Sequence, residues 1–114
     1  MPNPVVHWEV TGKNGKKLQD FYSKLFDWKM DTNNPMKYGM VTPGGMKGIN
    51  GGVSETKGKG RVTFFVEVTD PEATLKVVKK LAGRTVLPVT KMGEMATIAL
   101  LTDPEGNEIG LVKG

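Results

Sequence analysis

The sequence of 114 residues contains no cysteine, which excludes a disulfide framework, a thiolate nucleophile and a cysteine metal site. It also lacks any apolar run near the roughly 20 residues that a membrane-spanning helix needs. The first residues have neither the basic start nor the apolar stretch of a secretory signal. These absences predict a cytoplasmic protein with no membrane partner.

Arginine and aromatic residues are scarce. The net charge is +4 and the pI about 9.4, a balance that raises the question of nucleic-acid binding. The 16 basic residues are spread along the chain, however, and only two of them are arginine. The densest groups are the pairs Lys16-Lys17 and Lys79-Lys80, each within an expected helix whose lysine face is solvated. Because single-strand binding interleaves aromatics with arginine, we expect no nucleic-acid partner.

Hydrophobic periodicity divides the chain into two similar halves. Residues 5–10 alternate as a strand, and an i, i+3, i+4 stripe from Leu18 to Phe26 predicts a helix. In the second half, Asp70-Pro71 is a helix start, and we expect that helix to end near Ala82 with Gly83 as its C-cap. The remaining strands are expected at 28–32, 37–42, 46–53, 62–68, 84–89, 95–101 and 107–112, with 54–60 as a polar linker.

The order strand, helix, strand, strand, strand therefore occurs twice, which indicates an internal repeat. An offset of 56 places Val66 on Val10. Near the end of each half the offset is expected to reach 60, which pairs Asn50 with Gly110. We expect a single domain over residues 1–114, built from modules at about 1–55 and 60–114.

Three segments resemble the vicinal oxygen chelate superfamily of glyoxalase, bleomycin-resistance and dioxygenase proteins. They are His7 in the first strand, the Asp20–Phe26 helix segment, and the turn and strand Asp103–Leu111. The resemblance implies an α+β fold: two βαβββ modules form a curled, mostly antiparallel sheet around a cup, with the helices outside. Small members of the family pair, so we expect a homodimer.

In metal-dependent members of that family, four positions in the cup hold a divalent ion. The resemblance places these positions on His7, Asn50, Thr63 and Gly110. Only His7 is a good donor for such an ion, and Gly110 has no side chain. Three carboxylates share this face but lie two residues, about 6.5 Å along the strand, from the metal positions. They are Glu9, Glu67 and Glu108. We therefore expect no metal and no cofactor.

The sequence leaves several functions open. The first is a metal-free binding protein that holds a small, partly apolar molecule in the cup. Its ligand-binding residues would be His7, Asn50, Thr63, Phe65 and Glu67. The second is a lyase or isomerase acting on a small carbonyl compound, with His7, the only histidine, or a Glu9 and Glu67 pair as catalytic acid and base. A metal-dependent glyoxalase or dioxygenase, or a purely structural module, remains a further alternative.

Overall fold

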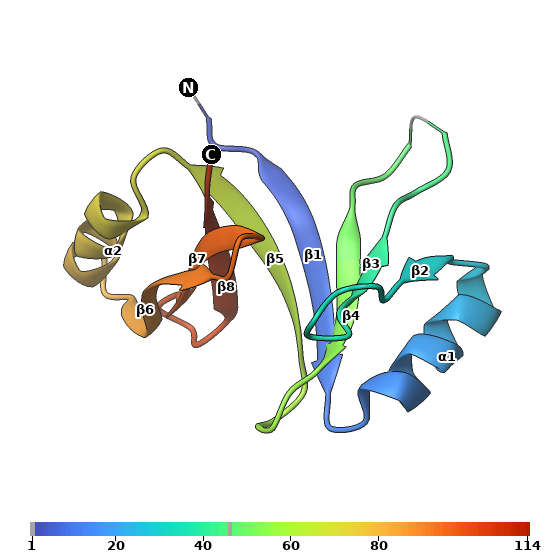
Figure 1. Ribbon diagram of the computed structural model, residues 1–114. Coiled ribbons are helices and arrows are strands. Elements are labelled where there is room, and N and C mark those ends of the chain that lie inside the picture. The colour runs from blue at the N-terminus through green and yellow to red at the C-terminus, as the bar shows by residue number, and fades with distance from the viewer. Residues whose placement is uncertain (1, 46) are drawn as a thin grey trace. The chain divides into compact units, whose positions relative to one another are not determined.

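The computed structural model describes residues 2–45 and 47–114, and these form two compact units (Figure 1). The central unit is His7–Thr63, and the terminal unit combines residues 2–6 with Phe64–Gly114. No helix in the described ranges is long and apolar enough to cross a membrane.

The central unit is a mixed sheet with one helix. Its elements are β1 (Val5–Gly12, of which the first two residues belong to the terminal unit), α1 (Gly15–Phe26), β2 (Met30–Asp31), β3 (Gly39–Val41) and β4 (Gly51–Glu55). The strand order is β2-β3-β4-β1. Strands β1 and β4 are parallel, whereas β3 is antiparallel to both of its neighbours.

The terminal unit repeats this arrangement. Its elements are β5 (Arg61–Val68, of which the first three residues belong to the central unit), α2 (Pro71–Lys80), β6 (Arg84–Met92), β7 (Ala96–Thr102) and β8 (Glu108–Lys113). The order β5-β8-β7-β6, with β5 parallel to β8 and the other pairs antiparallel, matches that of the first module. The α+β fold with two βαβββ modules is therefore confirmed.

Strand pairing corrects the register of the repeat. Glu9 pairs with Gly52 in the first module, and Phe65 pairs with Gly110 in the second. Because Glu9 and Phe65 are 56 residues apart, Gly52 is the counterpart of Gly110, and the pairing of Asn50 with Gly110 was wrong by two residues. The cause is a loop: the connection from Met40 to Gly52 is two residues longer than the one from Leu100 to Gly110.

The core of the terminal unit lies between α2 and its sheet. The buried side chains belong to Val68, Ala99, Leu101 and Leu111, with Leu75 and Val78 of α2 packed against them. Burial of this set supplies the hydrophobic free energy that holds the helix on the sheet. Of the stripe Val77, Val78 and Leu81 that predicted this helix, only Val78 packs on the sheet, whereas Val77 and Leu81 are exposed.

The end of α2 differs from expectation. The helix ends with Leu81 as its C-cap, and Ala82, not Gly83, adopts the left-handed conformation, with φ of 70°. Gly83 instead donates its N–H to the Val78 carbonyl at 2.9 Å. A Cβ on Gly83 would lie 2.7 Å from the Thr102 carbonyl oxygen, so glycine is required there for close approach to β7.

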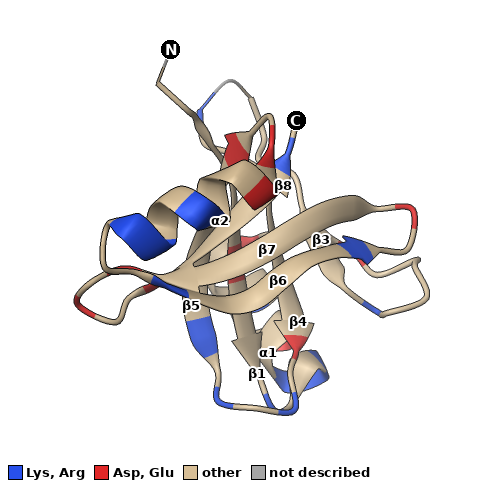
Figure 2. Cartoon of the chain, turned by 90° about the vertical axis from the view of Figure 1, so that its left-hand side faces the viewer, with Lys and Arg blue, Asp and Glu red and all other residues tan. Residues whose placement is uncertain are grey.

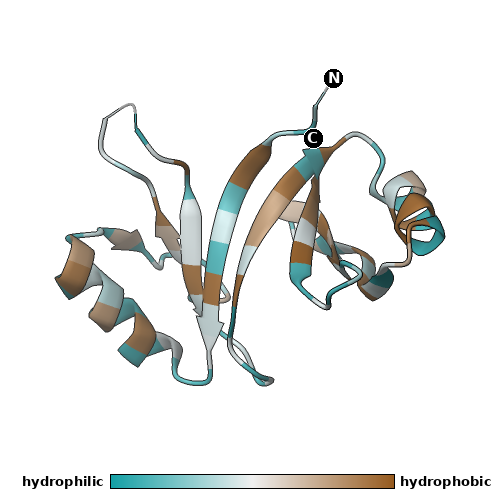
Figure 3. Cartoon of the chain, turned by 180° about the vertical axis from the view of Figure 1, so that it is seen from behind, coloured by the Kyte–Doolittle hydropathy of each residue, from teal (hydrophilic) through white to brown (hydrophobic). Residues whose placement is uncertain are grey.

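Helix α1 is anchored differently from the way its apolar stripe predicts. Phe21, Leu25 and Phe26 are each more than half exposed, and Figure 3 shows hydrophobic segments along this helix. The buried contact is polar: the Gln19 side-chain amide donates to the Val53 carbonyl at 2.8 Å and to the Lys37 carbonyl at 3.1 Å. Because both acceptors are backbone groups next to the sheet, Gln19 fixes the helix to β4 and to the loop before β3.

The turn that carries part of the family resemblance has a structural role. One carboxylate oxygen of Asp103 accepts the N–H groups of Glu105 and Asn107, both at 2.9 Å. The other oxygen accepts the side-chain amide of Asn107 at 2.9 Å. These hydrogen bonds hold the pKa of the Asp103 carboxyl below its usual value. The aspartate therefore closes the turn between β7 and β8.

Several predicted bounds in the first half were too long. Strands β2 and β3 are shorter than the predicted 28–32 and 37–42, and β4 begins only at Gly51. The predicted start of that strand at Met46 lies outside the described residues. Ser54, placed in the expected linker, is instead buried in β4.

Candidate functional site

Four polar side chains of the central unit form one hydrogen-bonded network. His7 Nε2 lies 2.8 Å from the Tyr38 hydroxyl, which donates to Glu9 Oε2 at 3.0 Å. Arg61 contacts Glu9 Oε1 at 3.4 Å, an ion pair in which the arginine side chain is 28% exposed and the glutamate 14%. We call this set the polar network. It brings a histidine, a phenol, a carboxylate and a guanidinium to one place.

Strand alternation puts the polar network on one face of the sheet. Along β1, His7 and Glu9 alternate with Trp8 and Val10, so the two pairs point to opposite faces of the strand. On the opposite face Trp8 lies 4.9 Å from Trp28, measured between ring centroids, beside the aromatic residues of α1. The apolar face thus fixes β1 against the helix, and the polar residues point away from it.

A glycine makes room for Tyr38. Gly52 pairs with Glu9 on one side and with Met40 on the other. A Cβ at Gly52 would lie 2.0 Å from the Tyr38 hydroxyl oxygen, well inside van der Waals contact. The Tyr38 ring therefore lies across β4 over Gly52, which is how a residue before β3 reaches a carboxylate on β1.

The loop before β3 holds Tyr38 by its backbone. The Asn34 side chain accepts the Tyr38 N–H at 2.9 Å and donates to the Tyr38 carbonyl at 2.8 Å. Lys37, the preceding residue, has a left-handed φ of 54° and is tied to α1 through Gln19. This double constraint fixes the position of the phenol.

The hydrogen-bond order follows from the donors available. Tyr38 has a single hydroxyl hydrogen, and a carboxylate can only accept, so that hydrogen lies toward Glu9. His7 must then donate from Nε2 to the Tyr38 oxygen. Burial lowers the pKa of His7 from its ordinary value of 6.5, so its imidazole is neutral at pH 7. Burial, together with the charge of Glu9 and its hydrogen bond, raises the pKa of Tyr38 far above its usual value, which keeps the phenol protonated.

Two buried hydroxyls share this face. Thr11 follows Glu9 by two residues, and Thr63 follows Arg61 by two, so alternation places both on the side of the polar network. They are 8% and 3% exposed, and neither Oγ1 has a hydrogen-bond partner within the described part of the chain. Buried hydroxyls rarely stay unpaired, so these two suit a bound water or ligand.

The structure brings together only some of the residues that the sequence singled out. His7 and Glu9 meet in the polar network, and Thr63 lies on its face. Asn50 precedes β4, where its carbonyl accepts the Trp8 N–H at 3.3 Å.

Phe65 and Glu67 belong to the terminal unit. The Phe65 side chain is buried over Gly110, whereas Glu67 is exposed near the end of β5. Their roles stay predictions.

Tyr38 and Arg61 were missed. Only Tyr38 carries a signal in hindsight: Gly52 leaves one face of β4 open to a large side chain. Tyr38 has the parity that points toward that face, two residues before Met40. Arg61, directly after a lysine- and glycine-rich loop, gives no such signal by itself.

The residues of the metal positions do not fit a divalent ion. The resemblance assigns one of these positions to Gly110, strand pairing makes Gly52 its counterpart, and neither glycine has a side-chain donor. In the second module, the Phe65 ring fills the space that a Gly110 side chain would occupy, at 2.3 Å from its Cβ position. His7 is engaged by a phenol, and among the described residues no three histidine, aspartate or glutamate side chains gather in a metal-binding group.

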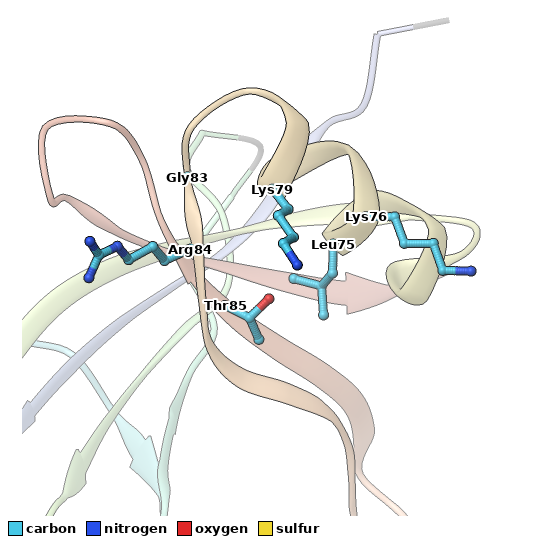
Figure 4. Close-up of a pocket in the computed structure, with 6 residues that line it drawn as sticks. All are labelled: Leu75, Lys76, Lys79, Gly83, Arg84 and Thr85. Atoms are coloured by element: carbon cyan, nitrogen blue, oxygen red, sulfur yellow. The ribbon is translucent and has the colours of Figure 1, made fainter.

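A groove of about 550 Å³ in the terminal unit has a different character. It lies between α2 and β6 and is lined by Leu75, Lys76, Lys79, Gly83, Arg84 and Thr85. Figure 4 shows Lys79 turned toward Leu75 and Thr85, whereas Lys76 and Arg84 extend away from them. The lining holds no carboxylate or histidine, so it offers no acid and base pair for proton transfer.

Comparison with known proteins identifies the family. The family of glyoxalase-like domains matches residues 10–112, nearly the whole chain. The chain belongs to this family. The resemblance to the vicinal oxygen chelate superfamily is thereby confirmed, and the duplicated βαβββ topology of this glyoxalase-like domain agrees with it. No protein of curated function matches the sequence.

Solved structures similar to this glyoxalase-like domain have diverse names. A glyoxalase/bleomycin resistance protein/dioxygenase superfamily member from Vibrio splendidus 12B01 is 17% identical, with a TM-score of 0.65 over 99% of this chain and 100% of that one. Methylmalonyl-CoA epimerase from Mycobacterium tuberculosis is 12% identical, with a TM-score of 0.66 over 96% and 86%. NAD-dependent benzaldehyde dehydrogenase from Legionella pneumophila is 20% identical, with a TM-score of 0.64 over 98% of each chain. Such identities show a shared fold, not a shared activity.

Proposed function

We propose that this glyoxalase-like domain binds a small, partly apolar molecule bearing a carbonyl or carboxylate group, without a resident metal ion. The observation that carries the proposal is the polar network, which is fixed in place by Gly52 and Asn34. A pre-organised set of donors binds a polar group without paying to order its own side chains. The unpaired Thr63 hydroxyl supplies a further donor on the same face.

The charge and neighbours of the polar network define the ligand class. Glu9 and Arg61 neutralise each other, so the network favours a polar group of small net charge over a free polyanion. Met40 pairs with Gly52 and so lies on the network face, where its half-buried side chain provides an apolar contact. A carbonyl flanked by an apolar group matches both features.

The binding proposal is tested with a panel of small 2-oxo acids and aromatic ketones, titrated into ¹⁵N-labelled protein and followed by NMR. A binder from the panel should shift the amides around Tyr38 and Glu9. Tyr38→Phe removes one hydroxyl and should weaken that binder about tenfold. Tyr22→Phe, the same change on α1, is the matched control and should leave the affinity within about twofold. If no compound shifts these amides, or if both variants weaken binding equally, the assignment is wrong.

A second candidate function is proton transfer at a carbon next to a carbonyl, as in an isomerase or epimerase. The favouring observation is the continuous hydrogen-bonded line from His7 through Tyr38 to Glu9, along which a proton can be redistributed. Some structural neighbours are named methylmalonyl-CoA epimerase, which is consistent with this chemistry on the same fold. The step balances because one proton leaves the substrate carbon for the acid/base group and one proton, from that group after exchange with water, returns to the carbon or to its neighbour.

The two candidates differ in deuterium exchange. Incubation of a bound panel compound in D₂O should give exchange of its α-hydrogen well above the protein-free rate if the domain is an enzyme. Glu9→Gln should abolish that exchange while leaving binding detectable. If the bound compound exchanges its α-hydrogen only at the protein-free rate, proton transfer is excluded and binding is the remaining function.

We also propose a homodimer in the cytoplasm with a small-molecule ligand as its only partner class. Support for pairing comes from the apolar side chains exposed on α1. Glu67, predicted as a partner of Glu9, remains a candidate acid or base.

A further inference from the structure

Five exposed lysines gather at one end of the central unit. We call them the lysine tip: Lys13, Lys16, Lys17, Lys57 and Lys59. They belong to the loop before α1, its first turn, and the loop between β4 and β5. The two loops are joined, because the Thr56 N–H donates to the Gly12 carbonyl at 2.9 Å. Figure 2 shows basic segments at the lower ends of β1, β4 and β5, where Figure 1 places both loops.

The positive charge of the tip is poorly compensated. The central unit has ten lysines and arginines against five acidic residues, whereas the terminal unit has six against seven. Near the tip, Asp20 pairs with Lys16 at 3.1 Å, and Glu55 accepts the Gly15 N–H at 3.2 Å. Lys13, Lys17, Lys57 and Lys59 have no carboxylate partner among the described residues.

The start of α1 is not itself the site. Its first turn contains no acidic residue, but the Glu55 carboxylate accepts the Gly15 N–H at 3.2 Å and so opposes the positive end of the helix dipole. A second leading N–H group, that of Lys17, is accepted by Asn14 at 3.0 Å. An anion would therefore be bound by the lysine side chains and not by the helix N-terminus.

The lysine tip adjoins the strands that carry Glu9 and Arg61 of the polar network. Along β1, three residue steps lead from Glu9 to Gly12, about 10 Å at 3.3 Å a residue. On the other side, Arg61 of the network follows directly after Lys59 and Gly60. One elongated molecule could therefore contact the network with one end and the lysine tip with the other.

We propose that the lysine tip binds the phosphate groups of a phosphorylated small molecule whose carbonyl end binds at the polar network. This inference rests on the proposed function and specifies its ligand class: a carbonyl compound joined to a phosphate-bearing tail. Lysine binds phosphate as a mobile point charge, and Gly58, between the two loop lysines, has open space around it. The tip has no aromatic residue on which bases could stack, which disfavours a nucleic acid.

The test uses inorganic pyrophosphate alone, titrated into the labelled full chain at low ionic strength. The expected result is a set of amide shifts confined to residues 12–17 and 56–61. The double variant Lys57→Gln/Lys59→Gln should weaken this binding about tenfold, since it removes two nearby charges. Lys76→Gln/Lys79→Gln changes the net charge equally on α2 and should leave the affinity within about twofold.

Further arms separate this inference from the proposed function. Tyr38→Phe should not alter pyrophosphate binding, and the loop double variant should not alter binding of an unphosphorylated ketone. Shifts spread over the whole surface, or equal weakening by both lysine pairs, would overturn the inference while leaving the network intact. A short DNA duplex that still binds the tip at about 0.15 M salt, where pyrophosphate has dissociated, would overturn it in favour of a nucleic acid.

Discussion

At the scale of single residues, His7 decides how the polar network behaves with pH. It is the only histidine, so its ring signals in an NMR titration are unambiguous. We expect its pKa to lie below 6.5, because burial disfavours the imidazolium. A pKa at or above 6.5 would contradict the buried, neutral ring that donates to Tyr38.

The same shift has a consequence for stability. The unfolded chain protonates His7 near pH 6.5, whereas the folded protein does so only at lower pH. Between these two pKa values the unfolded state binds more protons, so the free energy of unfolding should fall as the pH drops below about 6.5. Urea unfolding at several pH values should show this fall, and His7→Gln should reduce it.

Gly52 should be the least replaceable glycine of the site. Gly52→Ala would place a methyl group 2.0 Å from the Tyr38 hydroxyl, so we expect a loss of about 1–3 kcal/mol and displacement of the phenol. Gly58→Ala, with no atom within 4 Å of the added carbon, is the control for urea unfolding. Because the proposed clash is with Tyr38, Gly52→Ala should cost much less in a Tyr38→Ala background. Equal costs in both backgrounds would show that the clash lies elsewhere.

At the scale of secondary-structure elements, Gln19 adds a buried polar anchor to the aromatic packing of α1. Gln19→Met keeps the volume but leaves the carbonyls of Val53 and Lys37 without this donor, which should cost about 2 kcal/mol in unfolding free energy. Lys24→Met, on the exposed side of the same helix, should change the free energy by less than about 0.5 kcal/mol. A loss confined to the control would refute this role of Gln19.

Elements were predictable where a local period encodes them. The alternation of β1 and the Asp70-Pro71 start of α2 led to the correct order and the correct fold. The short strands β2 and β3 were overextended, because their ends depend on which neighbours pair with them. The repeat register failed for a related reason, since a loop length shifts one strand against another without any local mark.

The candidate site was predictable only in part. His7 and Glu9 could be found because residues two positions apart on a strand point to the same face. Tyr38 could not, because its place depends on a left-handed Lys37 and on space over a glycine that is 14 positions away in the chain. Arg61 could not be found either, because it lies more than 50 residues after its partner Glu9 in the chain. No periodic pattern in the sequence relates residues so far apart.

At the scale of the whole molecule, the exposed apolar side chains bear on assembly. Phe21 and Leu25 of α1 are each 57% exposed, and Leu81 after α2 is 69% exposed. Light scattering coupled to size exclusion should give twice the chain mass of 12.4 kDa across a range of concentrations. A mass of one chain throughout that range would contradict the homodimer.

The glycines opposite Glu9 and Phe65 leave an equivalent opening in each module, and the two openings have diverged. The Tyr38 phenol lies over Gly52 and is hydrogen-bonded to Glu9 and His7. The Phe65 ring, which has no polar group, lies over Gly110. Among the described residues, only the first module therefore has hydrogen-bonding groups over its glycine. A smaller side chain at position 65 should enlarge the space over Gly110, whereas Tyr38→Phe should keep the ring over Gly52 and remove only its hydrogen bonds.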